Sequence, residues 1–306
     1  YLLNGKFTKL LAFSLALIFS FNVGAQDAAE VPAVSGEVAY ILNTFLFLVC
    51  GFLVMFMAAG FCMLEAGQVR SKNTAVICLK NIGLFSIAGF MYYLVGYNLM
   101  YDGVDGGYIG SFSMFDRSSE VDLETGYAAA SDWYFQMVFV ATTASIVSGA
   151  LAERILIWPF FLFTAILTAF IYPIAGSWQW GGGWLSEMGF SDFAGSTLVH
   201  SVGGYAALAG AILLGARDGK YSADGKVNVI GGCSLPMTTL GVFILWLGWF
   251  GFNGGSQLAL GSGADATAVA DIFVNTNLAA AGGVLACMIV SKACLLYTSP
   301  SPRDCQ

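Results

Sequence analysis

Charged residues are scarce in this sequence. They make up 10% of 306 residues, whereas ordinary soluble domains contain about 25%. Because 58% of the residues are hydrophobic, so few charges cannot cover a water-facing surface, and a soluble globular domain is excluded. Acidic residues outnumber basic ones by 19 to 12, so the chain has no basic patch with which to bind nucleic acid. The composition indicates an integral membrane protein whose main partner is the lipid bilayer.

Paired cysteines and clustered metal ligands are also missing. Five of the seven cysteines lie singly in or beside apolar stretches: Cys50, Cys62, Cys78, Cys233 and Cys287. None has the paired spacing of a zinc site or a redox dithiol. We therefore expect them to pack as small hydrophobic residues. Nothing in the sequence requires a cofactor or a metal ion.

The first 25 residues are typical of a secretory signal peptide. Lys6 and Lys9 precede an apolar run over residues 10–21, and residues 23–25 form a small-x-small cleavage pattern. The apolar run is too short to span a bilayer comfortably. We therefore expect cleavage near Gln26, which would place the mature amino terminus outside the cell.

The predicted membrane domain covers residues 26–293. After Lys292 the composition changes abruptly to a polar, proline-containing stretch over residues 294–306. This stretch resembles the vector-derived end of a truncated gene fragment, so we expect a non-native tail. A genuine short cytoplasmic tail is the alternative.

Hydropathy predicts seven membrane-spanning helices. Each needs about 20 predominantly apolar residues at a rise of 1.5 Å per residue. Helices are expected because every backbone amide must find its partner within the segment in lipid. The predicted spans are 38–64, 75–100, 132–151, 156–175, 195–216, 235–258 and 268–291.

The positive charges sort to one side of the predicted membrane. With the amino terminus outside, the cytoplasmic side receives Arg70, Lys72, Arg154, Arg217, Lys220, Lys226 and Lys292, while only Arg117 lies among the acidic external loops. This positive-inside pattern agrees with the signal peptide and predicts a multi-pass protein of the cell membrane. Lys80 lies about two turns inside the second span, and we expect it to snorkel back to the cytoplasmic surface.

His200 is the single histidine of the chain, and it lies inside a predicted span. An ionisable group within a membrane is costly, so a functional role competes with that of a hydrogen-bonded core residue. Small residues surround it on its helix, which predicts a tight helix junction. Asp192 precedes this helix and is expected to cap or brace its amino-terminal end. Binding an external cation is the alternative role for Asp192.

Two aromatic sets have helical spacing. Phe135 and Phe139 lie four residues apart, and Trp249, Phe252 and Ser256 follow at i, i+3 and i+7, so each set is expected to share a helix face. Packing is the more common reason for such stripes. A site built from aromatic faces, however, also attracts a small cation, by about 2 kcal/mol when it is desolvated.

Four ordered segments resemble the ammonium transporter family, the Amt/Mep/Rh group. They are residues 64–73 (LEAGQVRSKN), 149–154 (GALAER), 192–200 (DFAGSTLVH) and 248–256 (GWFGFNGGS). The resemblance covers about residues 38–291, which correspond to the first seven of the family's usual eleven spans. It implies the all-α, polytopic fold of ammonium transporters, in which two inverted halves surround a pore. It does not suggest an enzyme.

The resemblance also implies roles for individual residues. Phe139, Trp180 and Ser256 would recruit ammonium on the external side, and Phe139 and Phe252 would form a phenyl gate below them. His200 would line a hydrophobic pore that passes ammonia, and Asp192 would support the recruitment site. The resemblance further implies ammonium or ammonia as substrate, with methylammonium as an alternative, a homotrimer, and a PII-type cytoplasmic regulator.

The second pore histidine and the last four spans of the family are not found in this sequence. The inverted-repeat architecture is therefore incomplete, and we expect the chain as printed to be inactive in transport. An ammonium sensor built on the same membrane fold is an alternative function. An intramembrane enzyme is disfavoured, because His200 has no candidate nucleophile or metal-binding partner within a span.

Overall fold

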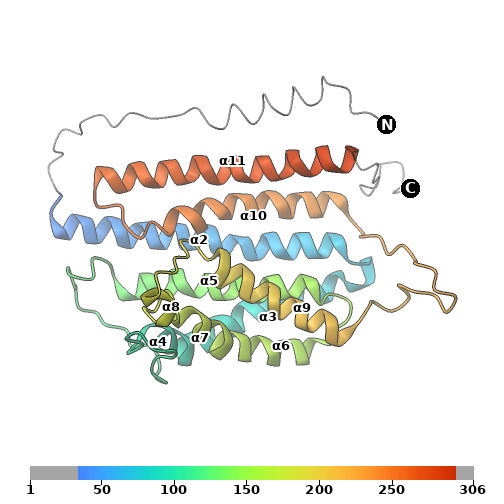
Figure 1. Ribbon diagram of the computed structural model, residues 1–306, viewed down its shortest axis with the longest axis horizontal. Helices are drawn as coiled ribbons and strands as arrows, with labels where there is room; N and C mark the ends of the chain where they lie inside the picture. The colour runs from blue at the N-terminus through green and yellow to red at the C-terminus, as the bar shows by residue number, and fades with distance from the viewer. Residues whose placement is uncertain (1–33, 294–306) are drawn as a thin grey trace. The chain divides into compact units, whose positions relative to one another are not determined.

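The computed structural model describes residues 34–293, and the regular structure in this range is helical (Figure 1). The predicted signal peptide, 1–25, and the predicted non-native tail, 294–306, lie outside the described residues. The elements in chain order are α2 (Gly36–Gln68), η1 (Ser71–Asn73), α3 (Thr74–Met91), η2 (Tyr92–Gly96), α4 (Tyr97–Tyr101), α5 (Ala129–Ala150), α6 (Ile157–Ile166), η3 (Leu167–Ile171), α7 (Tyr172–Ser177), α8 (Trp184–Glu187), η4 (Ser196–Ser201), α9 (Val202–Leu214), α10 (Leu235–Gly255) and α11 (Gly263–Ala293).

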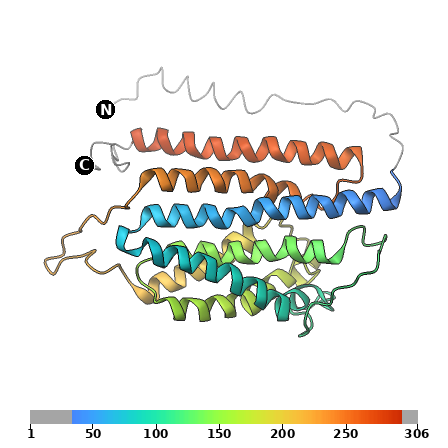
Figure 2. The ribbon, with the colours of Figure 1, turned by 180° about the vertical axis from the view of Figure 1, so that it is seen from behind.

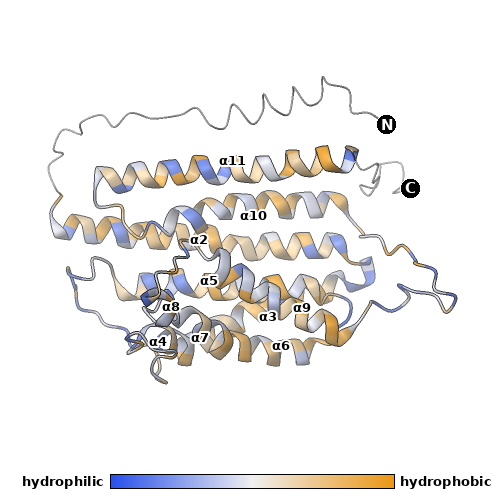
Figure 3. Cartoon of the chain, viewed as in Figure 1, coloured by the Kyte–Doolittle hydropathy of each residue, from blue (hydrophilic) through white to orange (hydrophobic). Residues whose placement is uncertain are grey.

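Six helical runs among the described residues are long and apolar enough to cross a membrane. They are Gly36–Gln68, Ser71–Tyr101, Ile157–Ser177, Ser196–Leu214, Leu235–Gly255 and Gly263–Ala293. Each overlaps a predicted span, and Figure 3 shows the predominance of hydrophobic residues along these helices. The predicted all-α, polytopic membrane fold is confirmed.

The remaining predicted span corresponds to α5, which is not among those six runs. Its hydroxyl-bearing residues lower its hydropathy, but Thr142, Thr143 and Ser145 are buried and donate hydrogen bonds to carbonyl oxygens four residues earlier. A buried helix tolerates such residues because the backbone satisfies their hydroxyl groups. Helix α5 packs against α2, α3 and α9, so it is enclosed by the other helices.

Helices α2 and α10 run antiparallel and pack closely through glycines (Figures 1 and 2). A methyl group added at Gly241 would overlap the backbone nitrogen of Leu64 and lie 2.7 Å from the carbonyl oxygen of Gly60. A methyl group at Gly251 would lie 2.6 Å from the carbonyl oxygen of Cys50. Small residues therefore let the two backbones touch, as is typical of helix pairs in membranes.

Replacing Gly241 with valine is expected to lower the free energy of unfolding by about 1–3 kcal/mol, because the added methyl groups force two backbones apart. Gly282 on α11 has no atom within 4 Å of an added methyl group, so Gly282→Val is the matched control. Unfolding of both variants in detergent, followed by circular dichroism, measures the difference. Equal losses for the two variants would contradict the packing argument.

The expectation that Lys80 snorkels to the surface is wrong. Its side chain is buried, with its amino nitrogen 3.5 Å from the Glu65 carboxylate and 2.8 Å from the carbonyl oxygen of Ser148. The Ser148 hydroxyl also donates to Glu65, at 2.7 Å. Lys80 therefore stays inside because α2 and α5 together supply an anion and a carbonyl acceptor, which compensate for its desolvation.

Candidate functional site

A pocket of about 330 Å³ opens between α4, the first half of α5 and the end of α10. Its volume lies at the small end of the range for ligand pockets. The predicted recruitment residues Phe139, Trp180 and Ser256 all line this pocket, although they come from three separate segments. The other lining residues are Tyr97, Tyr101, Tyr127, Asp132, Phe135, Gln136, Phe193 and Leu258.

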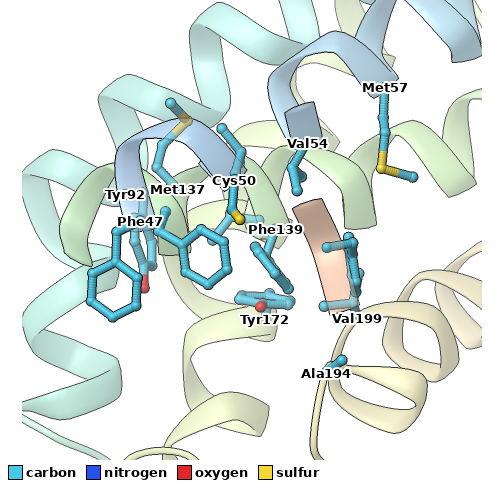
Figure 4. Packing of buried hydrophobic residues seen from close by; sticks show 14 of the residues in the cluster. Phe47, Cys50, Val54, Met57, Tyr92, Met137, Phe139, Tyr172, Ala194 and Val199 are labelled. Atoms are coloured by element: carbon cyan, nitrogen blue, oxygen red, sulfur yellow. The ribbon is translucent and has the colours of Figure 1, made fainter. Parts of the chain in front are cut away.

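The Phe139 ring lines this pocket and lies close to two other aromatic rings. Its centroid is 6.0 Å from the Trp180 ring in an edge-on arrangement, and 4.1 Å from the Phe252 ring at an interplanar angle of 31°. Phe139 and Phe252 are each 1% exposed. Figure 4 shows Phe139 among the buried residues of one core cluster, which also contains Cys50 and Tyr172, so the core holds the ring in place.

The three residues of the predicted set on α10 differ in burial. Phe252 and Ser256 are buried beside Phe139, but Trp249 is 39% exposed and lies outside the lining of the pocket. The i, i+3 spacing brings Trp249 near the same side of the helix without directing it into the same cavity.

The polar groups of the recruitment residues are fixed by hydrogen bonds to the backbone. The Ser256 hydroxyl donates to the carbonyl oxygen of Phe252 at 2.8 Å, which leaves its lone pairs free to accept a hydrogen bond from a ligand. The Trp180 indole nitrogen donates to the carbonyl oxygen of Asp192 at 2.7 Å, which fixes the plane of its ring. The pocket therefore presents π-faces and a hydrogen-bond acceptor, which suits a small cation with N–H donors.

The Asp192 carboxylate organises the segment that enters η4. Its two oxygens accept four backbone N–H donors at 2.8–3.0 Å, from Gly195, Ser196, Thr197 and Leu198. Asp192 is 7% exposed. This is the capping arrangement that the sequence suggested, extended to four donors, and the carboxylate does not line the pocket.

Gly195 allows this turn to form. Its φ of +98° belongs to the left-handed region, which side chains disfavour. An added methyl group would also lie 2.5 Å from the Val199 side chain and 3.2 Å from the Trp180 ring. The glycine therefore sets the entry of η4 and the distance between η4 and Trp180.

His200 lies in η4, a short π-helical segment, and such segments are frequent at functional sites. Its ring centroid is 5.5 Å from that of Phe252, and its Nδ1 atom is 3.1 Å from the carbonyl oxygen of Gly195. The structure therefore places His200 next to the phenyl pair, on the side of Phe252. Within residues 34–293 the imidazole is exposed, so the predicted tight junction does not enclose it.

Sequence reasoning missed the polar part of the pocket. Asp132, which the sequence analysis did not identify as a site residue, lies in the first turn of α5 and is only 8% exposed. Gln136, one turn later, also lines the pocket. Asp132 and Gln136 have the same i, i+4 spacing as Phe135 and Phe139 on this helix, and this spacing is the signal that could have identified them. Among residues 34–293, no cluster of three His, Cys, Asp or Glu side chains is placed to bind a metal ion.

Glu153 holds a second network just beyond the other end of α5. One of its oxygens accepts hydrogen bonds from the Arg70 backbone, the Arg70 guanidinium and the Asn73 amide, and the other pairs with Arg217 at 3.0 Å. Burial alone would raise the pKa of the Glu153 carboxyl, but these hydrogen bonds outweigh burial and lower its pKa from 4.5 to about 2. Two of the segments that carried the family resemblance are thus joined by one carboxylate.

The fold and the pocket together define a multi-pass membrane protein with a pocket lined mainly by aromatic side chains. The sequence profile of the Ammonium Transporter Family matches residues 45–294. The chain belongs to this family, as the resemblance predicted, and it is therefore a transport-family protein and not an enzyme.

Known relatives support this assignment over most of the chain. Ammonium transporter Amt2 of Archaeoglobus fulgidus is 45% identical over 278 residues, which make up 88% of this chain and 56% of that protein. A solved structure of a sensor Amt protein matches with a TM-score of 0.78 and 38% identity, covering 85% of this chain and 64% of that one. Candida albicans Mep2 matches with a TM-score of 0.64 and 29% identity, covering 74% and 51%. The chain thus spans about half to two thirds of the length of these proteins.

Proposed function

We propose that these residues form the entrance and first part of a pore that moves ammonium nitrogen across the cell membrane. The observation that carries the proposal is the convergence of Phe139, Trp180 and Ser256 on one pocket. The Phe252 ring lies against Phe139, and the His200 ring lies against Phe252. Ammonium would be recruited on the external side, and the amino terminus would lie on that side too.

Recruitment would rely on the electrostatics of the aromatic rings. The quadrupoles of the Phe139 and Trp180 rings attract a cation once water is excluded. The Ser256 hydroxyl oxygen accepts a hydrogen bond from one N–H group of that cation. Potassium has nearly the same size but offers no N–H donor. The pocket therefore favours ammonium by directed hydrogen bonding.

Passage beyond the pocket would require loss of a proton. Phe139 and Phe252 lie 4.1 Å apart and are almost fully buried, so a bare cation between them would lose its hydration without gaining a counter-charge. Neutral ammonia avoids this cost, and His200 can exchange hydrogen bonds with it below the rings. Potassium has no proton to lose and would be rejected at this step.

Ammonium binding tests the entrance. A ligand stabilises the folded state according to its affinity. The unfolding temperature is measured at increasing concentrations of ammonium chloride, with sodium chloride at equal ionic strength as the reference. The rise specific to ammonium gives its dissociation constant. We expect Trp180→Leu to weaken ammonium binding about tenfold, a loss of about 1.4 kcal/mol. Trp158 is 77% exposed on α6, so Trp158→Leu is the matched control and should bind as the unmodified chain does. A chain that responds equally to sodium and ammonium would refute the proposed function.

Transport tests the pore. We expect the printed chain to be inactive in transport. His200 is exposed among residues 34–293, so these residues do not enclose a pore around it. A chimera that adds the part of the Archaeoglobus fulgidus protein not matched by this chain should take up labelled methylammonium into proteoliposomes. His200→Ala in that chimera is expected to reduce uptake about tenfold or to admit potassium. Unchanged uptake and selectivity would show that His200 has no role in the pore.

Ammonium sensing is the second candidate function, because one similar solved structure is a sensor Amt protein. In this case the pocket would bind ammonium and report its occupancy to a cytoplasmic partner. A chimera that binds ammonium but takes up no methylammonium would favour sensing over transport. A homotrimer and a PII-type regulator remain part of the proposal for the whole protein, and light scattering in detergent tests the first of them.

A further inference from the structure

We propose that Asp132 forms a second cation-binding position in the pocket, distinct from the one formed by Phe139, Trp180 and Ser256. This inference rests on the proposed function, since it assigns a further binding group to the same entrance. The cation it would take is small and monovalent and carries N–H donors, such as ammonium or methylammonium.

The first argument is the position of the carboxylate. Asp132 lines the pocket while being only 8% exposed, so its charge lies in a small cavity and not at an open surface. Three tyrosines and three phenylalanines line the same cavity: Tyr97, Tyr101, Tyr127, Phe135, Phe139 and Phe193. A carboxylate in such surroundings is poorly hydrated, so a cation that enters the cavity stabilises it strongly.

The second argument is that residues 34–293 place no such cation beside Asp132. The ion pairs among residues 34–293 are Arg70–Glu153, Lys80–Glu65 and Arg217–Glu153, and Asp132 takes part in none of them. Buried carboxylates are usually paired with a positive charge or bound to a metal. Within the described part of the chain, the Asp132 carboxylate has only neutral partners, the Tyr97 hydroxyl and the Gln136 amide, whose nitrogen is 3.5 Å away.

The third argument is the arrangement of the neutral partners. The Tyr97 hydroxyl donates to one carboxylate oxygen, and the Gln136 amide approaches the other at a distance too long for a strong hydrogen bond. Each carboxylate oxygen has two lone pairs, so acceptor capacity remains for the N–H groups of a ligand. The carboxylate is thus oriented by the protein but is not saturated.

The two positions would act in sequence. Asp132 lies one turn before Phe135 and two turns before Phe139 on α5, so it lies nearer the amino-terminal end of this helix than the phenyl pair. A cation held first by charge would then move to the aromatic position, where no fixed charge retains it. The carboxylate would raise the local concentration of the cation, and the aromatic position would pass it on.

The test is ammonium binding by the full chain, measured from the unfolding temperature as above. Asp132→Asn is expected to weaken ammonium binding at least tenfold. Asp122→Asn, which changes an exposed loop carboxylate and keeps the same net charge as the first variant, is expected to bind within twofold of the unmodified chain. Circular dichroism establishes that both variants are folded.

The outcomes separate this inference from the proposed function. If Asp132→Asn binds ammonium normally while Trp180→Leu does not, the second position is overturned and the proposed function stands. If Asp132→Asn and Asp122→Asn weaken ammonium binding equally, the second position is also overturned, because the change in net charge would then explain the effect. If the unmodified chain does not distinguish ammonium from sodium, both proposals fail.

If Asp132→Asn does not fold, Tyr97→Phe decides the question. This change removes the hydroxyl that competes for the carboxylate and leaves the ring in place. Ammonium should then bind about threefold more tightly, because the Asp132 oxygen that no longer accepts the Tyr97 hydroxyl holds more of the carboxylate's negative charge. Unchanged or weaker binding in Tyr97→Phe would overturn the inference.

Discussion

Replacing Asp192 with alanine is expected to lower the free energy of unfolding by about 3–5 kcal/mol. Four backbone N–H groups lose a charged acceptor at once, and hydrogen bonds to charged groups contribute about 1.5–3 kcal/mol each when counted singly. The four losses are not additive, because water can reach the more exposed donors after the change. Unfolding in detergent at neutral pH measures the effect.

The same substitution is expected to weaken ammonium binding, because the backbone of Asp192 holds the Trp180 indole. Asp192→Asn keeps one carbonyl oxygen and should retain a substantial part of the stability. Asp122→Ala is the control, since Asp122 also accepts nearby hydrogen bonds but lies in an exposed loop and should leave the unfolding midpoint unchanged. A loss in Asp192→Ala no larger than in this control would mean that water replaces the carboxylate at little cost.

Replacing Glu153 with glutamine is expected to destabilise the protein by about 2–3 kcal/mol at pH 7. The guanidinium groups of Arg70 and Arg217 lose their counter-charge. Because both are about a third exposed, the expected loss of stability is smaller than for a fully buried ion pair. Glu153 also has a φ of +64°, a conformation that side chains disfavour, so its hydrogen bonds help to hold the turn after α5.

The effect of Glu153 should depend on pH. Its pKa is depressed to about 2 in the folded protein from 4.5, so its contribution to stability is complete above pH 4.5 and is lost as the pH falls toward 2. The unmodified chain should therefore lose more stability over this interval than Glu153→Gln. Unfolding midpoints of both proteins between pH 2 and pH 7 provide the measurement. Glu124→Gln, in the exposed loop before α5, is the control, and parallel curves for the unmodified chain and Glu153→Gln would contradict the assigned network.

Much of the proposed site was accessible from the sequence because it depends on local spacing. The aromatic pair on α5 and the pair Phe252 and Ser256 on α10 follow the helical repeat, so their shared faces were predictable. The role of Asp192 as a cap followed from its position before a helix. Trp249 shows the limit of this reasoning, because helical spacing alone does not say which residue at the edge of a face enters a cavity.

The residues that were misread depend on contacts between distant segments. Lys80 was expected at the surface because its distance from the helix end suggested snorkelling, whereas a carboxylate on α2 and a carbonyl oxygen on α5 hold it inside. Asp132 was not identified as a site residue because the pocket that it lines also needs Tyr97 and Tyr127, which lie outside α5. Neither set of partners follows from hydropathy.

The sequence by itself determined that the protein lies in a membrane, that it is helical, and to which family it belongs. These properties follow from composition, from runs of apolar residues and from motifs, all of which are written along the chain. Only the tertiary structure decided which charges are buried, how Phe139 meets both Trp180 and Phe252, and that Asp132 lacks a cationic partner among residues 34–293. The reason is physical: burial and ion pairing arise between segments that are far apart in sequence, and they exist only once the helices have packed.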